Sequence, residues 1–195
     1  MLIAFEGGEG SGKSTQARLL AARLGAVLTF EPGGTALGAE LRALLLDGGD
    51  VDPRAEALLM AADRAQHRSE VVEPALDRGL HVVTDRYLYS SLAYQGYGRG
   101  LDVEAVRSLS VFAGAPEADL VILLTITAAV RRERLQGNLD RIEAGDDAFH
   151  ARVEKGFLEL AARDRKRWVV IAATGAVESV AERVWTEVEA RLPRH

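Results

Sequence analysis

The sequence begins with the apolar run Leu2-Ile3-Ala4-Phe5-Glu6 and continues directly into Gly7-Gly8-Glu9-Gly10-Ser11-Gly12-Lys13-Ser14. The first run has the length and composition of a buried strand, whereas Lys13 to Leu24 repeats apolar residues at helical spacing. The glycine-rich octapeptide matches the pattern GxxxxGK followed by Ser or Thr in full, and it joins the strand to the helix as that motif requires. The stretch therefore predicts a phosphate-binding loop in an α/β fold.

Each part of this loop has a physical role in binding the phosphates of ATP. Glycines let the backbone curl so that successive amides point at phosphate oxygens, and the following helix presents its positive N-terminal end to the same anion. Lys13 is expected to reach the β- and γ-phosphates, and Ser14 to bind the Mg²⁺ ion that accompanies ATP. The residues expected to bind ATP are Gly7, Gly8, Glu9, Gly10, Ser11, Gly12, Lys13, Ser14 and Thr15.

The rest of the chain alternates short apolar runs with longer helical periods. Further strands are predicted at Ala26 to Phe30, Leu80 to Thr84, Leu120 to Ile126 and Trp168 to Ala172. Helices are predicted at Ala39 to Leu46, Pro53 to Arg78 with a kink at Pro74, Val103 to Phe112 and Val177 to Leu192. This alternation predicts a doubly wound, five-stranded parallel sheet with helices on both faces, whose ligands bind beyond the carboxyl ends of the strands.

Length and composition narrow the class of protein. The 195 residues, 48% of them apolar, predict a single domain spanning residues 1–195 with a sizeable core. The absence of cysteine excludes disulfides, thiolate metal sites and cysteine nucleophiles. A net charge of −5 offers no basic field for nucleic acid, and no apolar run approaches the ~20 residues that span a membrane. Since no secretory signal is recognisable either, we expect a cytoplasmic protein with neither nucleic acid nor membrane as partner.

The loop alone leaves two classes open, a phosphotransferase and a nucleotide-driven switch. A GTPase switch usually carries Asn/Thr-Lys-x-Asp for guanine, which neither Lys155 nor Lys166 provides. His81-Val82-Val83-Thr84-Asp85 supplies an apolar strand that ends in a carboxylate, as both classes require. Asp85 is therefore a second candidate, with Ser14, for binding Mg²⁺ directly or through water, but it does not discriminate between the classes.

Arginines favour the transferase. A phosphoryl acceptor that is itself a phosphate ester needs its own cationic cradle, preferably of bidentate guanidinium groups. Arg42, Arg64 and Arg86 are the candidates, and Arg86 follows Asp85 at the ligand end of a predicted strand.

A second group of arginines precedes a polar, glycine-containing segment. Arg131, Arg132 and Arg134 come just before residues 136–148, which have the composition of a closing lid. Residues 131 and 134 share a helical face, so at least two guanidinium groups can converge on one anion. Because loose phosphoryl transition states spread charge over the transferred group, arginines that arrive on closure stabilise it.

Together these residues resemble bacterial thymidylate kinases, nearly end to end. The resemblance is carried by Phe5-Glu6-Gly7 with the phosphate loop, Glu31-Pro32-Gly33-Gly34-Thr35, Leu58-Leu59-Met60-Ala61-Ala62-Asp63-Arg64, Asp85-Arg86-Tyr87 with Ser90-Ser91 and Ala93-Tyr94-Gln95, and Leu139-Asp140-Arg141 with Glu143. The last four are specific to the family when they occur together. The resemblance implies a nucleoside monophosphate kinase fold, a homodimer, and transfer of the γ-phosphoryl of ATP to dTMP with Mg²⁺.

The family pattern also implies individual roles. Arg64 would bond a thymine carbonyl, Ser91 and Gln95 would read the base edge, and Tyr94 would lie against the sugar and favour deoxyribose. Arg42 and Arg86 would hold the acceptor phosphate, Glu9 would lie near the sugar 3′-hydroxyl or a magnesium water, and adenine would rest near Ala173 to Val177. The phosphate loop contains no arginine, so the chain resembles the kind whose catalytic arginines lie in the lid. The expected catalytic residues are Lys13, Arg86, Arg132, Arg134 and Arg141.

Two positions depart from the family pattern. Met60 stands where an aromatic residue often stacks on thymine, and a thioether can also pack against a ring. Phe30 stands where an arginine often precedes Glu-Pro-Gly-Gly-Thr, and Phe30 could help to pack the base. The sequence therefore favours a thymidylate kinase. Its alternatives are a kinase of another nucleoside monophosphate or of a deoxynucleoside, and a nucleotide-driven switch ATPase.

Overall fold

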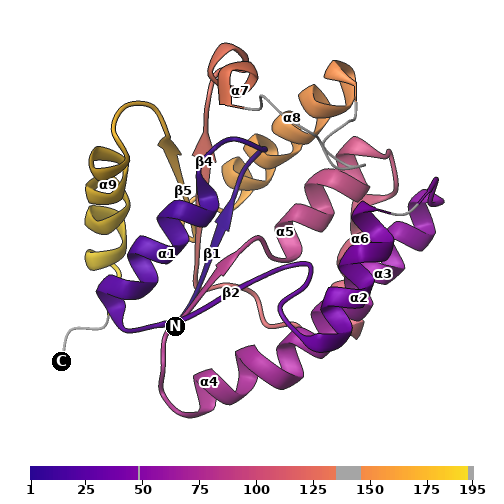
Figure 1. Ribbon diagram of the computed structural model, residues 1–195, viewed down its shortest axis with the longest axis horizontal. Helices are drawn as coiled ribbons and strands as arrows, with labels where there is room; N and C mark the ends of the chain where they lie inside the picture. Colours follow the sequence, from indigo (N-terminus) through magenta and orange to yellow (C-terminus); the bar gives the residue numbers. More distant parts are fainter. Residues whose placement is uncertain (48, 135–145, 193–195) are drawn as a thin grey trace.

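Five parallel strands form the centre of the molecule (Figure 1). The computed structural model describes residues 1–47, 49–134 and 146–192. The strands are β1 (Leu2–Glu6), β2 (Val27–Phe30), β3 (Val82–Asp85), β4 (Leu120–Thr125) and β5 (Trp168–Ala172), in the order β2-β3-β1-β4-β5. All five predicted strands are present, with ends that differ from the predicted ones by one or two residues at most.

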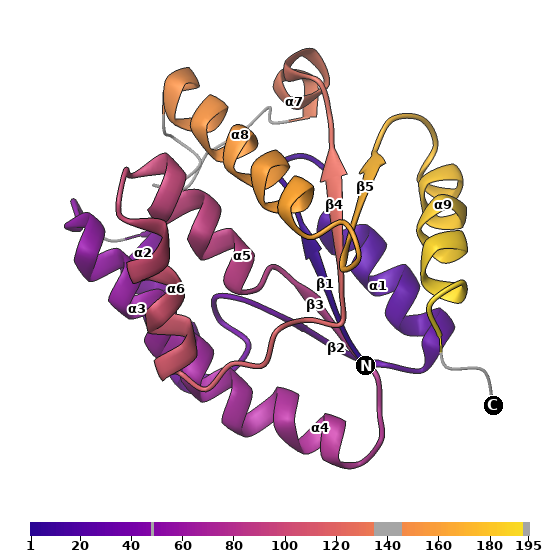
Figure 2. The same ribbon diagram turned by 180° about the vertical axis from the view of Figure 1, so that it is seen from behind.

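Helices cover both faces of this sheet, so the predicted doubly wound architecture is confirmed (Figures 1 and 2). One face carries α1 (Lys13–Leu24) and α9 (Val177–Glu189), which pack on each other. The other face carries α5 (Leu88–Ser91), its π-helical continuation Leu92–Gly98, and α8 (Asp147–Arg163). The remaining helices are α2 (Ala36–Leu46), α3 (Pro53–His67), α4 (Glu73–Asp77), α6 (Val103–Phe112) and α7 (Ala128–Arg134).

The alternation of side chains along β1 explains the two layers. Leu2 and Ala4 belong to the core beneath α5 and α8, whereas Ile3 and Phe5 belong to the core beneath α1 and α9. All four are at most 1% exposed, as expected for a central strand that is covered on both sides. Fully burying one such aliphatic or aromatic side chain contributes about 1.5–3 kcal/mol, so both layers are firmly anchored to the sheet.

The long helix predicted over Pro53 to Arg78 is divided differently from the prediction. α3 ends at His67, a π-helical segment follows over Arg68–Val72, and α4 begins at Glu73. Pro74 lies in the first turn of α4, but the residues before it are helical too, so its missing N–H leaves a gap in the hydrogen bonding of a continuous helical run. The change of winding therefore lies in the turn directly before Pro74, where a proline disturbs a helix, and the kink itself stays a prediction.

The predicted lid at residues 136–148 overlaps the start of α8. The side chain of Asp146 accepts a hydrogen bond of 2.6 Å from the backbone N–H of Phe149, which caps the helix. Asp147 and Ala148 are therefore helical, and residues 136–145 lie outside the described part of the chain.

The sheet topology brings two segments together at its carboxyl edge. β1 pairs with β3 in register Phe5↔Asp85, yet β1 leads into α1 on one face and β3 into α5 on the other. A ligand crevice forms where neighbouring strands lead to opposite faces, so the residues after β1 and β3 share one site. In the described part of the chain, no helix is long and apolar enough to cross a membrane.

Candidate active site

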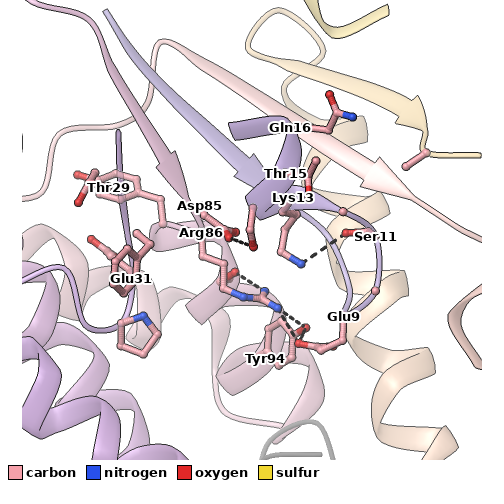
Figure 3. Close-up of a pocket in the computed structure, with 18 of the residues that line it drawn as sticks. Glu9, Ser11, Lys13, Thr15, Gln16, Thr29, Glu31, Asp85, Arg86 and Tyr94 are labelled. Atoms are coloured by element: carbon pink, nitrogen blue, oxygen red, sulfur yellow. Dashed lines mark hydrogen bonds and ion pairs between the residues drawn. The ribbon is translucent and has the colours of Figure 1, made fainter. Parts of the chain in front are cut away.

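A cavity of about 910 Å³ opens at this carboxyl edge. Its wall is built from the loop after β1 with the start of α1, the ends of β2 and β3, and the loop after β5 with the start of α9. Parts of α2, α3, α5 with its π-helical continuation, and α7 complete it, and Figure 3 shows several of the side chains. Most of the residues predicted to bind ATP or the acceptor line this one cavity: Glu9, Gly10, Ser11, Gly12, Lys13, Ser14, Thr15, Phe30, Arg42, Met60, Arg64, Asp85, Arg86, Ser91, Tyr94, Gln95 and Arg134. The two predicted anion sites are therefore parts of one continuous space.

Steric constraints explain why glycine occupies several positions of the loop. Gly7 has φ 139°, and a Cβ there would collide with the carbonyl oxygen of Leu124. Gly10 and Gly12 have φ 74° and 86°, in the left-handed region that side chains disfavour. These positions turn the chain back toward α1, whose first residue is Lys13. Gly7 and Gly8 do not line the large cavity but a smaller one of about 50 Å³ behind the loop.

Lys13 folds across this loop. Its Nζ donates to the carbonyl oxygen of Gly8 at 2.8 Å and to Oγ of Ser11 at 3.4 Å, and only 6% of the residue is exposed. Burial, followed by the nearby positive charge of Arg86, lowers the pKa of Lys13 to about 8. Lys13 is therefore still mainly protonated at neutral pH, and its charge is concentrated where little water screens it.

Ser14, in the first turn of α1, meets Asp85, the last residue of β3. The Ser14 hydroxyl donates to Oδ2 of Asp85, while Oδ1 of Asp85 is buried without a hydrogen-bond partner among the described residues. A hydroxyl and a carboxylate with a spare lone pair are the oxygen donors that Mg²⁺ accepts. No group of three or more His, Cys, Asp or Glu that could hold a metal exists in the described ranges. This donor set fits an ion whose other ligands are phosphate oxygens and water.

Arg86 is held by a dense set of contacts (Figure 3). Its guanidinium donates to Oε1 of Glu9 at 2.6 Å, to the Tyr94 hydroxyl at 3.3 Å and to Oγ of Ser90 at 3.0 Å. The backbone of Arg86 has φ 70°, the only positive φ among the described non-glycine residues. Such a conformation is costly for an L-residue and persists only where the surroundings enforce it, which is typical of functional sites.

Glu9 is an anion among these cations. Burial opposes its ionisation, but the charges of Arg86 and Lys13 and a hydrogen bond from Tyr94 outweigh burial and lower the pKa of Glu9 to about 2. The Tyr94 hydroxyl donates to Oε1 of Glu9 at 2.6 Å. Glu9 therefore fixes both the guanidinium of Arg86 and the ring of Tyr94 at the centre of the cavity wall.

Glu6 lies directly beneath Arg86 and was not identified from the sequence as a site residue. It is fully buried, and its carboxylate accepts from the backbone N–H groups of Tyr87 and Ser90 at 3.0 and 3.1 Å and from Oγ of Ser90 at 2.6 Å. Burial raises the pKa of Glu6 to about 7, although these hydrogen bonds and Arg86 oppose the rise. Glu6 ties the start of α5 to the end of β1 and thereby supports the backbone that carries Arg86.

Arg64 lies in the half of the cavity farther from the phosphate loop. Its guanidinium donates to Glu31 at 2.9 Å, to Ser91 at 3.0 Å and to Ser110 at 3.0 Å, and 2% of the residue is exposed. Oε1 of Glu31 lies 2.8 Å from Nδ1 of His67. These partners orient the guanidinium. His67 and Ser110 lie in no motif that the sequence reveals, and Glu31 stands out there only as part of Glu31-Pro32-Gly33-Gly34-Thr35.

Three other predicted acceptor residues line the same half. Arg42 donates to the carbonyl oxygen of Pro32 at 2.9 Å, and both Arg42 and Phe30 pack around Gly33, where a Cβ would crowd them. Phe30 is 45% exposed, which is high for a large apolar side chain and leaves it open to a ligand. Met60 is partly buried on α3 and also lines the cavity. The wall around the predicted base site is therefore apolar on these two sides.

The arginines of α7 lie in three different environments. Arg134 donates to the carbonyl oxygens of Gly10 and Ala173, at 2.9 and 3.2 Å, and lines the large cavity. Arg131 lines the smaller cavity behind the loop. Arg132 is exposed, and the described residues give it no hydrogen bond or ion pair. Of the three α7 arginines, only Arg134 lines the large cavity. Arg141 lies outside the described residues.

Comparison with known proteins identifies the family of the chain. The family model described as thymidylate kinase matches residues 5–184. The chain belongs to the thymidylate kinase family. It is 49% identical to a thymidylate kinase of a Synechococcus species over 99% of this chain and 96% of the relative, and 48% identical to one of Bifidobacterium longum over 98% and 97%.

Solved structures agree with these relatives. The crystal structure of a thymidylate kinase from Ehrlichia chaffeensis matches with a TM-score of 0.80 and 30% identity, covering 97% of this chain and 98% of that one. Thymidylate kinase family membership makes this chain an ATP-dependent nucleoside monophosphate kinase. The nucleotide-driven switch that the loop alone left open is therefore set aside.

Proposed function

We propose that this chain transfers the γ-phosphoryl group of ATP to dTMP, giving dTDP and ADP. The observation that supports this most is the single cavity that joins the phosphate loop to a second cationic and polar region carrying Arg42, Arg64 and Arg86. An acceptor phosphate bound there would lie beside the phosphates of ATP without leaving the cavity. Holding two reactants in line in this way supplies much of the rate of such transfers.

On the donor side, the loop amides and Lys13 would hold the β- and γ-phosphates. Ser14 and Asp85 would hold Mg²⁺, directly or through water, because their oxygens are the donors that this ion prefers. When bound, Mg²⁺ neutralises negative charge on the transferring phosphates. Adenine would rest against Ala173, Gly175 and Val177, which line the same cavity beyond β5.

On the acceptor side, Arg86 and Arg42 would bind the phosphate of dTMP. Tyr94 would lie against the sugar, and its hydroxyl bond to Glu9 would keep the ring in one position, so that a 2′-hydroxyl is excluded by shape. Phe30 and Met60 supply apolar surface for the base, and Arg64, Ser91 and Gln95 supply its polar contacts.

The transfer needs no covalent intermediate on the protein. The acceptor phosphate oxygen attacks the γ-phosphorus of ATP, and the bond to the β-γ bridging oxygen breaks as ADP leaves. Lys13 and Arg86 would neutralise the charge that spreads over the transferred group, and Arg134 would add a guanidinium from α7. Arg132 and Arg141 stay proposals of the same kind.

A kinase of free deoxynucleosides is the alternative within this fold. It would bring no phosphate ester to the cavity, so the guanidinium groups of Arg42 and Arg86, which line it, would have no acceptor phosphate to bind. The cationic cradle therefore favours a monophosphate acceptor.

A coupled assay of ADP release against a panel of acceptors tests the proposal. dTMP should support rapid turnover with Mg²⁺, whereas dGMP, dAMP and thymidine should support little, and removal of Mg²⁺ should abolish the reaction. ADP release at an equal rate without any acceptor would instead indicate a hydrolytic switch. Rapid turnover with thymidine would indicate the deoxynucleoside kinase.

We also propose that the chain forms a homodimer. Large apolar side chains are exposed on three helices that pack on one another: Leu37 and Leu44 on α2, Leu58 on α3, and Val111 and Phe112 on α6. Figures 1 and 2 place these helices together on the side of the molecule away from α1 and α9. Such a surface suits association with a second copy. A cytoplasmic location and the absence of nucleic acid as a partner stay predictions from composition.

A further inference from the structure

Gln95 and Glu56 form a buried pair at the far end of the cavity, where the base of the acceptor would lie. Nε2 of Gln95 donates to Oε1 of Glu56 at 2.9 Å, and the two residues are 1% and 0% exposed. Arg99 approaches the same carboxylate from the outside, with Nε 3.3 Å from Oε1 and a terminal nitrogen 3.2 Å from Oε2. Gln95 lines the cavity, whereas Glu56 and Arg99 lie behind it.

This pair fixes which end of the Gln95 amide faces the cavity. An amide can present either its oxygen or its NH₂ group, but an ionised carboxylate only accepts hydrogen bonds. The guanidinium of Arg99 on both oxygens favours the ionised form of Glu56. Gln95 must therefore turn its NH₂ group toward Glu56, because the opposite orientation would place two acceptors against each other in a buried site.

The consequence is a buried acceptor with no partner. Oε1 of Gln95 is buried and has no hydrogen bond to any described residue, although Gln95 lines the cavity. A buried polar atom left without a partner destabilises the protein, so it favours a ligand that donates to it. Four residues earlier, Ser91 already accepts from Arg64 at 3.0 Å, which leaves its hydroxyl proton for a carbonyl in the cavity.

We infer that Glu56 is a specificity-determining residue, which positions the Gln95 amide so that its oxygen selects a base with an N–H donor at the matching edge. Thymine and uracil carry an N3–H donor between two carbonyl acceptors, whereas cytosine presents an acceptor at N3. Glu56 does not touch the substrate. It acts through Gln95 and excludes cytosine by denying the amide its other orientation.

The inference rests on the proposed function and is tested through the choice of base. In Glu56→Gln the new amide can donate to Gln95, so Gln95 can present its own NH₂ group to the cavity. The ratio of kcat/KM for dTMP over dCMP should then fall by about tenfold or more, while the KM for ATP stays unchanged. Glu104→Gln, which removes a well-exposed carboxylate on α6, serves as the matched control and should keep the wild-type ratio.

The outcomes separate the two proposals. If the wild-type protein does not phosphorylate dTMP, the proposed function fails. If it does and a folded Glu56→Gln protein keeps the wild-type ratio, or if Glu104→Gln lowers the ratio equally, the inference about Glu56 is overturned. Should Glu56→Gln not fold, Arg99→Gln tests the same pair at a partly exposed position, because it removes the guanidinium that favours the carboxylate. A wild-type ratio in folded Arg99→Gln overturns the inference as well.

Discussion

At the scale of single residues, the site places three charges close together in a space with little water. Lys13 and Glu9 are each 6% exposed, and Arg86 lies between them, 2.6 Å from the Glu9 carboxylate. Charges in such surroundings interact far more strongly than at the surface, so each removal should have a large effect. Asp85 and Glu6 also act on both cations, so the positive charges of Lys13 and Arg86 are held in place by several carboxylates.

Lys13→Ala tests the donor side. The variant should fold, because among the described residues Lys13 bonds only to its own loop. Turnover should fall on the order of 100-fold or more, since a point charge on the transferring phosphates is lost. Steady-state kinetics with circular dichroism as the folding check measures this. Lys155→Ala is the control, because its side chain is 73% exposed on α8. Near wild-type turnover in folded Lys13→Ala would remove the loop lysine from the mechanism.

Glu6 predicts how stability depends on pH. Its pKa is raised from 4.5 to about 7 by burial, so the folded state binds a proton that the unfolded state releases. The stability that Glu6 contributes is therefore full below about pH 4.5 and is lost as pH rises toward 7, at up to about 1.4 kcal/mol per pH unit.

The comparison with Glu6→Gln isolates this effect from Asp63, whose pKa burial raises to about 6 in the same direction. Chemical denaturation at several pH values should show the wild type losing stability relative to the variant between pH 4.5 and 7. A constant difference across that range would mean that Glu6 titrates in its ordinary range and that its burial is compensated.

Tyr94 tests the choice of sugar. Tyr94→Phe should keep the preference for deoxyribose, since the ring excludes a 2′-hydroxyl by shape, although it loses the bond to Glu9. Tyr94→Ala should relax the preference and also destabilise the fold by about 3–5 kcal/mol, because the ring packs against Phe149 and Phe157. Ratios of kcat/KM for dTMP over its ribose analogue measure the first effect. An alanine variant that discriminates as sharply as the wild type would show that another group reads the sugar.

At the scale of elements, α3 shows why part of the site escaped prediction. The buried residues of this helix are Glu56, Ala57, Asp63, Arg64 and His67, so the stripe that faces inward is mostly charged. Positions 56, 63, 64 and 67 follow helical spacing, and this periodicity was readable in the sequence. Charged residues at such spacing usually mark a solvent face, however, so the pattern alone points to the wrong side of the helix.

The residues that could be predicted are those whose partners are near in the sequence. The phosphate loop is a local motif, and its strand and helix follow from adjacent periodicity. By contrast, Glu6 acts on residues 81 and 84 positions away, and Glu31 meets Arg64 across 33 positions. Only the fold brings such pairs together, so their roles required the structure. Family resemblance supplied Arg64 and Gln95, but it gave no role to the carboxylates that orient them.

An arginine of α7 is expected to stabilise the negative charge that develops during phosphoryl transfer. Arg134 bridges the phosphate loop and the segment after β5, so its guanidinium already lies at the donor side of the cavity. Arg134→Ala should lower turnover by an amount equivalent to about 2–4 kcal/mol while changing the KM values less, because the charge it meets develops during transfer.

Arg132→Ala is the informative partner of that variant, since Arg132 is exposed and reaches the site only if the region around α7 closes. Kinetics with ATP and acceptor varied separately distinguish the two arginines, and Arg165→Ala, at an exposed position beyond α8, is the control. A loss confined to the KM values in Arg134→Ala would make it a binding residue, and the catalytic charge would then fall to Arg141.

At the scale of the whole molecule, the parallel sheet lets one cavity serve two substrates. The class of fold follows from the alternation of strands and helices, but the order β2-β3-β1-β4-β5 does not, because every buried parallel strand here is similarly apolar. Placing β1 beside β3 brings the phosphate loop to Asp85 and Arg86. The π-helical segments at Arg68–Val72 and Leu92–Gly98 also have no signal in the apolar periodicity.

The exposed apolar surface on α2, α3 and α6 is where we expect two copies of the chain to associate. Phe112 is 94% exposed and Val111 is 70% exposed. Stable specific interfaces typically bury more than ~1,000 Å² and favour aromatic residues near their centre, so Phe112 is suited to the centre of such an interface. If this surface joins two copies, Phe112→Glu should place a charge at the same contact twice, because a two-fold interface repeats each residue. Sedimentation velocity should then show a dimer for the wild type and a monomer for the variant.

Leu19→Glu is the matched control, because Leu19 is a 40% exposed leucine on α1, in the opposite helical layer. It should stay dimeric. The same experiment reports on the site, since α3 presents Leu58 to this surface and Met60 and Arg64 to the cavity. Loss of the dimer should therefore weaken binding of the acceptor more than binding of ATP, whose loop lies at the other end of the cavity. A dimer that persists in Phe112→Glu but dissociates in Leu19→Glu would move the interface to the layer of α1 and α9, and acceptor binding would then be independent of association.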